Sequence, residues 1–506
     1  MKKKISWLLI LLLTFSLVSF AEDDYSEPIE ITWMIPTQQS ISLGESIPVK
    51  KLLEKFNITV NWIELNPVDQ HPEKLNLLLA SRQLPDIISW VDKDYAARYG
   101  AEGAFLEITP YLKDYFPNIA GVLEREASSY YVSYTLDDKL WYIPTWTRTA
   151  PPNWGWSINQ EAFAEVGYPI EKLKSFDDFK AALVLLKKAY PDSFPLVSRT
   201  AEFGISNFLS SFVIPFTRGM TGYGIIGFDY DSKEWKINAR IDGYKEALMY
   251  IHGLYQEGLL DPEFITCDMN TLITLFAEKK GFATADFVGG LSGVGDVQNQ
   301  VNNVLYPIEW PSPVQGVESI MGSKAIPIAS RGTVLPAEIV NDEAKFARVS
   351  AMLDFMYSDE WYDLFYNNPD VLEGEGPAYV KAYYERKDNL RDLYFPWGIF
   401  ANFQDDPLRE DVEPGTPWAD FCIRWGNEYA SRLTENVIMP FDSDTQSEIN
   451  DITNTVTDYW NANVMQFVIG RTSFDDWDAF VAGMMDAGGT ELESIYNASY
   501  NEFYGK

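Results

Sequence analysis

The chain has 506 residues, a length that allows two large lobes or about three smaller domains. Hydrophobic residues make up 46% of it and charged residues 23%, an ordinary globular balance that excludes a mainly disordered chain. The net charge of −34 argues against nucleic acid or an anionic membrane surface as the main partner, since both attract basic proteins. With only two histidines, a His-rich metal site is excluded as well.

The N-terminal residues have the pattern of an export signal. Residues 2–4 are lysines, residues 5–20 form an apolar run, and Ser19 and Ala21 place small side chains where a signal peptidase requires them. The run is shorter than the ~20 residues of a membrane-spanning helix, so we expect a cleavable signal at 1–21 rather than an uncleaved anchor. No cysteine follows the cleavage point, so we expect no lipid anchor and a periplasmic protein.

The mature chain opens with alternating strands and helices. The residue patterns predict strands over 29–36, 57–64 and 87–90, and helices over 44–56 and 71–83. Strands that are separated by helices in this way form parallel sheets. Ligands bind beyond the C-terminal ends of such strands, so the residues that follow the first and third strands are candidates for a binding site.

The later segments differ in character. Segment 140–159 contains four Trp and three Pro without a helical period, and we interpret 146–156 as the first crossing between two lobes. Ser175 is expected to cap a helix. Helical patterns then predominate: an amphipathic helix is predicted at 243–258, a helix-to-strand unit at 272–287, and a mostly helical region at 341–506.

Six segments, in this order and spacing, resemble one family. They are LLLASRQLPDIISW (77–90), DDKLWYIPT (137–145), GLYQEGLLDPEF (253–264), LFAEKKGF (275–282), AMLDFMYSDE (351–360) and FVIGRTSFDDWDAF (467–480). Together they resemble the extracellular solute-binding proteins of ABC transporters, of the large carbohydrate-binding type (family 1-like). The resemblance implies an α/β, bilobal periplasmic-binding-protein fold with a helical C-terminal region. It also implies a cleft that closes on an oligosaccharide, and a permease in the inner membrane as partner.

On this resemblance we expect two lobes joined by crossing strands. The first would contain 22–147 and about 298–345, and the second 155–297 and about 346–506.

The chain also departs from the family. The segment after the crossing is SINQEAFAEVG (157–167) instead of a basic, acidic and Trp-containing run, so contacts made by those charges are in doubt. Some large relatives carry a calcium loop where this chain has AYPDSFPLVS (189–198). That stretch offers only Asp192 as a carboxylate, whereas calcium requires six to eight oxygens, so we expect no calcium there.

Sugar rings have apolar faces and hydroxyl edges, so a sugar site requires aromatic platforms beside planar polar groups. Aromatic residues at strand ends or in crossing segments are therefore candidates, with core packing as the alternative for each: Trp90, Trp146, Trp154, Trp156, Phe287, Trp310 and Trp397. The polar candidates are Gln38, Asp92, Arg148 and Asp286.

Arg148 and Asp286 could each hydrogen-bond two adjacent hydroxyls or instead form ion pairs, and Arg148 could meet a sugar carboxylate. By contrast, Trp361 and Trp477 lie in helical patterns and are expected in the core.

Three further features have simple interpretations. Residues 222–227 match G-x-G-x-x-G, but a turn and strand follow where a dinucleotide site requires a helix, so we interpret them as a loop. Asp442 and Asp444 are expected to cap a helix. Cys267 and Cys422 are either a disulfide or two separate thiols.

No nucleophile elbow, phosphate-binding loop or zinc-protease motif is present, so we expect a binding protein and not an enzyme. The prediction is a monomer that captures an oligosaccharide without a cofactor. The alternatives are a binding protein for peptides or other small polar solutes, and a secreted carbohydrate-active enzyme such as a glycosidase.

Overall fold

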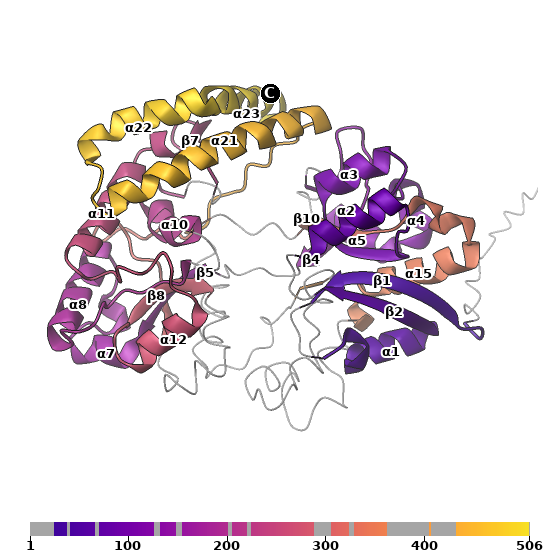
Figure 1. Cartoon of the computed structure of the whole chain (residues 1–506), viewed down its shortest axis with the longest axis horizontal. Helices are drawn as coiled ribbons and strands as arrows, with labels where there is room; N and C mark the ends of the chain where they lie inside the picture. The colour runs from indigo at the N-terminus through magenta and orange to yellow at the C-terminus, as the bar shows by residue number, and fades with distance from the viewer. Residues whose placement is uncertain are drawn as a thin grey trace, which may run out of the picture.

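A computed structural model of the chain describes residues 25–37, 41–65, 70–125, 132–147, 154–200, 205–219, 224–287, 305–322, 328–361, 404–405 and 432–504. The described elements form two bodies of strands and helices that lie side by side (Figure 1). We call the body that contains most of the N-terminal elements the first lobe and the other the second lobe. Among the described residues, no helix combines the length and the apolar character needed to cross a membrane.

A six-stranded sheet forms the centre of the first lobe, in the order β11-β4-β10-β3-β1-β2. β1 pairs in parallel with β2 and β3, whereas β10 runs antiparallel to both β3 and β4. The parallel β1–β3 unit confirms the prediction for the start of the mature chain. The strands are β1 (Ile29–Pro36), β2 (Ile58–Leu65), β3 (Ile87–Asp92), β4 (Ile143–Thr147), β10 (Ile328–Val334) and β11 (Gln404–Asp405).

Helices of the first lobe bury their apolar stripes against this sheet. In α1 (Ile47–Phe56), Val49, Leu52 and Phe56 recur at helical spacing and are buried. The helix ends at Asn57, whose left-handed backbone (φ 47°) turns the chain into β2. The other helices are α2 (His71–Ser81), α3 (Lys93–Ala101), α4 (Leu112–Tyr115), α5 (Pro117–Arg125) and α15 (Glu343–Phe355).

The second lobe has a small antiparallel sheet in place of a parallel one. β5 (Trp154–Asn159) lies between β8 (Ala283–Phe287) and β9 (Leu305–Ile308), and β6 (Ile226–Asp229) forms a hairpin with β7 (Glu234–Ile237). Helices supply most of this lobe: α7 (Gln160–Glu165), α8 (Phe176–Ala189), α10 (Ile205–Phe216), α11 (Tyr244–Gln256), α12 (Met269–Ala277), α21 (Ser443–Val468), α22 (Trp477–Met484) and α23 (Thr490–Tyr504). In Figure 1, α21, α22 and α23 lie across the top of the lobe.

Several local predictions are confirmed. Ser175 and Asp178 form a capping box at the start of α8, in which each side chain accepts a hydrogen bond from the other residue's backbone N–H. Asp442 caps α21 by accepting from the backbone of Thr445 at 2.7 Å, whereas Asp444, predicted to cap with it, lies inside the first turn of the helix. The glycine-rich segment leads into the β6–β7 hairpin. A dinucleotide-binding fingerprint would instead lead into a helix, so the interpretation as a loop holds.

The chain divides between the lobes differently from the expected ranges. β9, expected in the first lobe, pairs with β5 of the second, and the nearby Trp310 belongs to the second core. α15, expected mostly in the second lobe, packs into the first core through Val349 and Leu353. Sequence patterns locate apolar stripes but do not say which sheet each stripe covers, and this accounts for both corrections.

Candidate functional site

Trp90 has a strained backbone at the C-terminal end of β3. Its φ is 72°, a left-handed value that is rare for a bulky side chain and costs of order 1–3 kcal/mol. Backbone strain of this kind concentrates at functional sites. Trp90 is only partly buried, although Ile88 and Ser89 before it and Val91 after it are fully covered. The sheet therefore holds this indole partly exposed at the C-terminal end of β3.

Arg331 of β10 packs against that indole. Its Cζ lies 3.9 Å from the centroid of the Trp90 ring, a close cation–π contact. In the β3–β10 register Arg331 is opposite Asp92, and its Nε lies 3.8 Å from Asp92 Oδ1, which is too long for a hydrogen bond. The two side chains are 41% and 76% exposed. Trp90, Asp92 and Arg331 thus form one cluster, the Trp90 cluster, on adjacent strands.

Beneath the Trp90 cluster lies a buried polar network. The Ser89 hydroxyl accepts a hydrogen bond from Trp33 Nε1 at 3.0 Å and lies 3.0 Å from the hydroxyl of Thr333. His71, at the start of α2, has its Nε2 2.8 Å from the carbonyl oxygen of Ser89. Burial lowers the pKa of His71 below its ordinary 6.5, so the neutral ring donates to that carbonyl. These contacts fix the backbone that holds Trp90.

In the second lobe, Asp286 of β8 is bound by Arg199. The guanidinium donates from Nε to Oδ2 at 2.5 Å and from Nη2 to Oδ1 at 2.7 Å, and both side chains are buried. Nearby on β5, Trp154 donates from Nε1 to the Ser211 hydroxyl at 2.8 Å. Asp286, predicted to hydrogen-bond a ligand, is therefore engaged first by an arginine of its own lobe.

The structure places most of the other predicted tryptophans in the core. Trp156 is completely buried and packs edge-on against Phe179 and Phe212. Trp146, Trp154 and Trp310 are 5%, 6% and 3% exposed, and the guanidinium carbon of Arg125 lies 5.2 Å from the Trp146 ring. In this conformation Trp156 offers no face to a ligand, and the other three offer little. The predicted core residues Trp361 and Trp477 are buried, as expected.

Four predicted site residues cannot be placed by their side chains. Gln38, Arg148 and Trp397 lie outside the described residues, as does Cys422. Phe287 pairs with Trp154 through its backbone in the β5–β8 ladder, and its side chain lies outside the described part. Cys267 is buried, and its thiol donates to the carbonyl oxygen of Asp268 at 3.6 Å.

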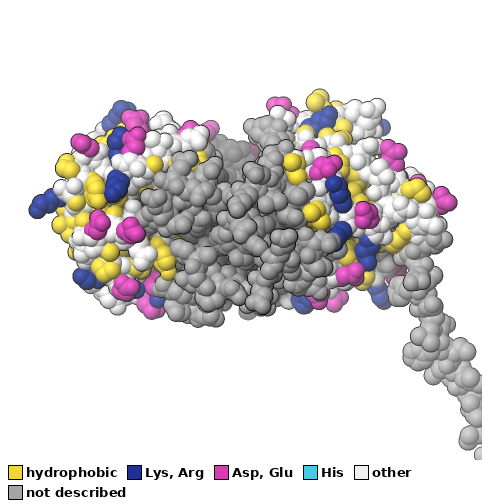
Figure 2. Space-filling view, turned by 90° about the horizontal axis from the view of Figure 1, so that it is seen from below, with side chains coloured by type: hydrophobic (Ala, Val, Ile, Leu, Met, Phe, Trp, Pro, Cys, Tyr) yellow, Lys and Arg dark blue, Asp and Glu magenta, His cyan; other side chains and the backbone are white. Residues whose placement is uncertain are grey.

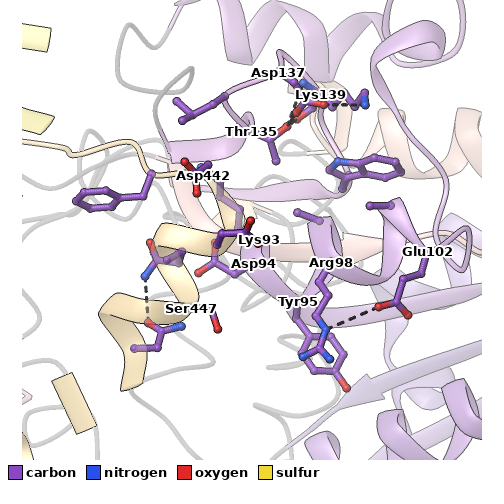
Figure 3. Close-up of a pocket in the computed structure, with 18 residues that line it drawn as sticks. Lys93, Asp94, Tyr95, Arg98, Glu102, Thr135, Asp137, Lys139, Asp442 and Ser447 are labelled. Carbon is purple, nitrogen blue, oxygen red and sulfur yellow. Dashed lines mark hydrogen bonds and ion pairs between the residues drawn. The ribbon is translucent and has the colours of Figure 1, made fainter. Parts of the chain in front are cut away.

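A pocket of about 860 Å³ opens between α3 of the first lobe and the first turns of α21 of the second (Figure 3). Lys93 and Asp94, directly after the Trp90 cluster, lie beside the first turn of α21 (Figure 3). Burial lowers the pKa of Lys93. The lining also contains the rings of Tyr95 and Trp141, together with Asn450 of α21. Because both lobes supply walls, any motion of one lobe against the other changes the shape of this pocket, which we call the α3–α21 pocket.

Sequence reasoning missed Arg331 and the residues of the α3–α21 pocket. Arg331 lies on an antiparallel strand more than 200 residues after its partners in β3, and no local pattern links them. The pocket residues of α3 follow β3 directly, so the rule that ligands bind beyond the C-terminal ends of strands could have pointed to them.

On the surface of both lobes, acidic and basic side chains are intermixed. On the face shown in Figure 2, basic and acidic side chains of the described residues are interspersed with hydrophobic ones on both lobes. The described surface of this face therefore has no extended basic region that would fit a polyanion such as nucleic acid.

Several solved structures have an architecture similar to that of this chain. An alginate-binding protein, AlgQ2 without calcium ion, matches with a TM-score of 0.70 at 17% identity, over 94% of this chain and 98% of the other. An HMO-binding, ABC-transporter-associated solute-binding protein of Bifidobacterium longum infantis gives 0.73 at 14% identity, over 94% and 99%. FusA of Streptococcus pneumoniae with kestose gives 0.71 at 15% identity, over 94% and 100%. These likenesses confirm the predicted bilobal fold.

Sequence comparison gives the family. Lipoprotein LipO of Bacillus subtilis (strain 168) is 35% identical over 86 residues, a segment that spans only 16% of each chain. The profile of the bacterial extracellular solute-binding proteins matches residues 45–363, well over half of the chain. The family predicted from the six sequence segments is thereby confirmed. The chain belongs to the bacterial extracellular solute-binding proteins.

Proposed function

We propose that this protein is the periplasmic solute-binding component of an ABC importer and captures an oligosaccharide between its two lobes. The observation that carries the proposal is the strained Trp90, which is held partly exposed at the end of β3 with a guanidinium against its ring. An aromatic face beside a planar polar group is the combination that a sugar ring requires. β10 and β4 lie on the side of the first lobe that faces the second (Figure 1).

The α3–α21 pocket supports the same proposal. Its volume of about 860 Å³ lies within the range of about 300–1,000 Å³ that is common for ligand sites. Its lining pairs aromatic rings with carboxylate, amide and ammonium groups, and it comes from both lobes. A ligand that contacts both walls would favour the closed arrangement of the lobes, because its contacts are complete only there.

The partners follow from this mechanism. The closed form would be recognised by a permease in the inner membrane, to which it delivers the sugar. We propose that the chain is exported by residues 1–21, acts as a monomer in the periplasm, and binds without catalysis or a cofactor. Two similar structures support a sugar ligand by their names, one an HMO-binding protein and the other FusA in complex with kestose.

The test is a thermal-shift screen of the chain from Glu22 onward against oligosaccharides, with a peptide mixture as control. A ligand at 100 times its Kd adds about 2.7 kcal/mol of stability, which is readily seen. Trp90→Ala should abolish the shift. Tyr190→Ala is the matched control, because Tyr190 follows α8 in the second lobe and its partly buried ring packs 4.7 Å from that of Phe282, away from the Trp90 cluster. A shift with peptides alone would contradict the sugar proposal, and cleavage of a sugar on incubation would contradict the absence of catalysis.

A further inference from the structure

Arg331 presents a positive charge whose hydrogen-bond donors are not satisfied by the described residues. Its guanidinium is held by the Trp90 ring, 41% of its side chain is exposed, and its nearest carboxylate oxygen is 3.8 Å away. Among the described residues, that separation from Asp92 is too long for a hydrogen bond. A guanidinium has five N–H donors in a planar fork. Most of the donors of Arg331 are therefore available to groups other than the described residues, such as a bound ligand.

Arg199 in the second lobe is a useful comparison, because its guanidinium is hydrogen-bonded to a carboxylate. Its two-point bond to Asp286 uses donors on Nε and Nη2, and the pair is sealed from solvent. Asp92 does not do this for Arg331. Its side chain is 76% exposed and free to turn toward water, so it offsets the charge of Arg331 only loosely.

On the basis of the proposed function, we propose that the oligosaccharide is acidic and that Arg331 is the residue that selects it. The sugar ring would pack beside Trp90 while the guanidinium fork of Arg331 binds the carboxylate of a uronic acid through two parallel hydrogen bonds. The fork matches a carboxylate better than it matches any neutral group of a sugar.

The charge of the whole chain makes a local cation necessary for such a ligand. A protein with a net charge of −34 repels anions at long range, so an acidic sugar is retained only where a positive group faces it directly. β10, the strand that carries Arg331, pairs with the strand of Trp90 and lies on the side of the first lobe that faces the second (Figure 1). Closure of the second lobe would exclude water and strengthen the contact.

The experiment is calorimetric titration of the chain from Glu22 with trisaccharides of galacturonic, mannuronic, guluronic and glucuronic acid, each beside its neutral, carboxyl-reduced counterpart. At least one uronide should bind about tenfold or more tighter than its neutral counterpart, equivalent to about 1.4 kcal/mol. Arg331→Gln should weaken that uronide by about tenfold or more and the neutral sugar by less than about threefold. Asp92→Asn should strengthen the uronide, because it removes the competing carboxylate.

Lys55→Gln is the matched control. Lys55 also lies over an aromatic ring, 4.8 Å from the centroid of Phe355, and pairs with Glu360 at 2.9 Å. It lies in the last turn of α1, just before β2 begins, and therefore at the end of the parallel strands opposite to that of Trp90. The same positive charge is lost, but far from the proposed site, and uronide affinity should stay unchanged.

The outcomes separate this inference from the proposed function. Neutral trisaccharides that bind as tightly as the uronides would overturn the inference and leave the proposed function intact. Uronide preference that survives Arg331→Gln would overturn the role of Arg331. If no uronide binds while the thermal-shift screen finds a neutral oligosaccharide, this inference fails and the proposed function stands; if the screen finds no oligosaccharide either, both fail.

Discussion

Arg199 and Asp286 form a two-point ion pair in which the side chains are only 6% and 0% exposed. The pair links Arg199, in the segment after Val197, to strand β8. Asp286 is also opposite Gly155 of β5 in the β5–β8 ladder. Its two hydrogen bonds match the fork of the guanidinium to the carboxylate and leave neither charge exposed. We interpret the pair as a contact that stabilises the packing of the Arg199 segment against the β5–β8 sheet of the second lobe.

The first prediction concerns that pair. Asp286→Ala leaves the Arg199 charge buried and uncompensated, so the free energy of unfolding should fall by about 3–5 kcal/mol. Replacement of both residues by apolar ones, Arg199→Met with Asp286→Leu, should cost less, because no buried charge is left over. Urea denaturation measures both. Equal stability of Asp286→Ala and the parent chain would show that the pair is not sealed in solution.

The second prediction separates two tryptophans that sequence reasoning treated alike. Trp156→Ala should lower the free energy of unfolding by about 3–5 kcal/mol, because a fully buried indole among Phe179 and Phe212 is lost. Trp90→Gly should change it by less than about 1 kcal/mol, because release of the strained backbone offsets the lost packing. Only the second variant should lose ligand affinity. The same loss of stability in both would contradict this assignment.

Local patterns along the sequence were sufficient to predict much of the fold. The strands β1 to β3, the cap at Ser175 and the buried stripe of α11 all follow from residue spacing, because each is decided by neighbours within one helical turn or one strand. The lobe assignments of β9 and α15 were wrong, because pairing with β5 and packing on the first core depend on contacts between distant segments.

The candidate site was harder to predict for the same reason. Trp90 was identified from its place after a predicted strand, and the structure holds it at that edge. Trp156 and Trp310 were identified by the same kind of reasoning but lie in the core. For Trp156 of β5 the reason is that alternate residues of a strand face opposite sides, and the sequence does not say which side is covered. Arg331 became visible only through the pairing of β10 with β3.

The third prediction tests the capping box of α8. Ser175→Ala removes the side chain that accepts from the backbone N–H of Asp178 at 3.1 Å. The free energy of unfolding should fall by about 1 kcal/mol, within the usual range for a lost N-cap. Ser81→Ala is the control, since Ser81 ends α2, is exposed, and only donates back to the carbonyl oxygen of Leu78. A smaller effect for Ser175→Ala than for this control would contradict the role of the cap.

The last prediction follows from the buried imidazole of His71. Because burial lowers its pKa below the ordinary 6.5, the unfolded chain binds the proton more readily than the folded one as the pH falls below that value. The contribution of His71 therefore lowers stability as the pH drops from 6.5, whereas above 6.5 both states are neutral and the contribution is constant. The chain has only two histidines, so an NMR titration of the ring protons reports the pKa directly once His71→Gln has assigned the signal. Below about pH 6.5, the stability of His71→Gln should fall less steeply than that of the parent chain. A ring that titrates at 6.5 or above would show that burial does not keep His71 neutral, because the hydrogen bond to the Ser89 carbonyl itself favours the protonated ring.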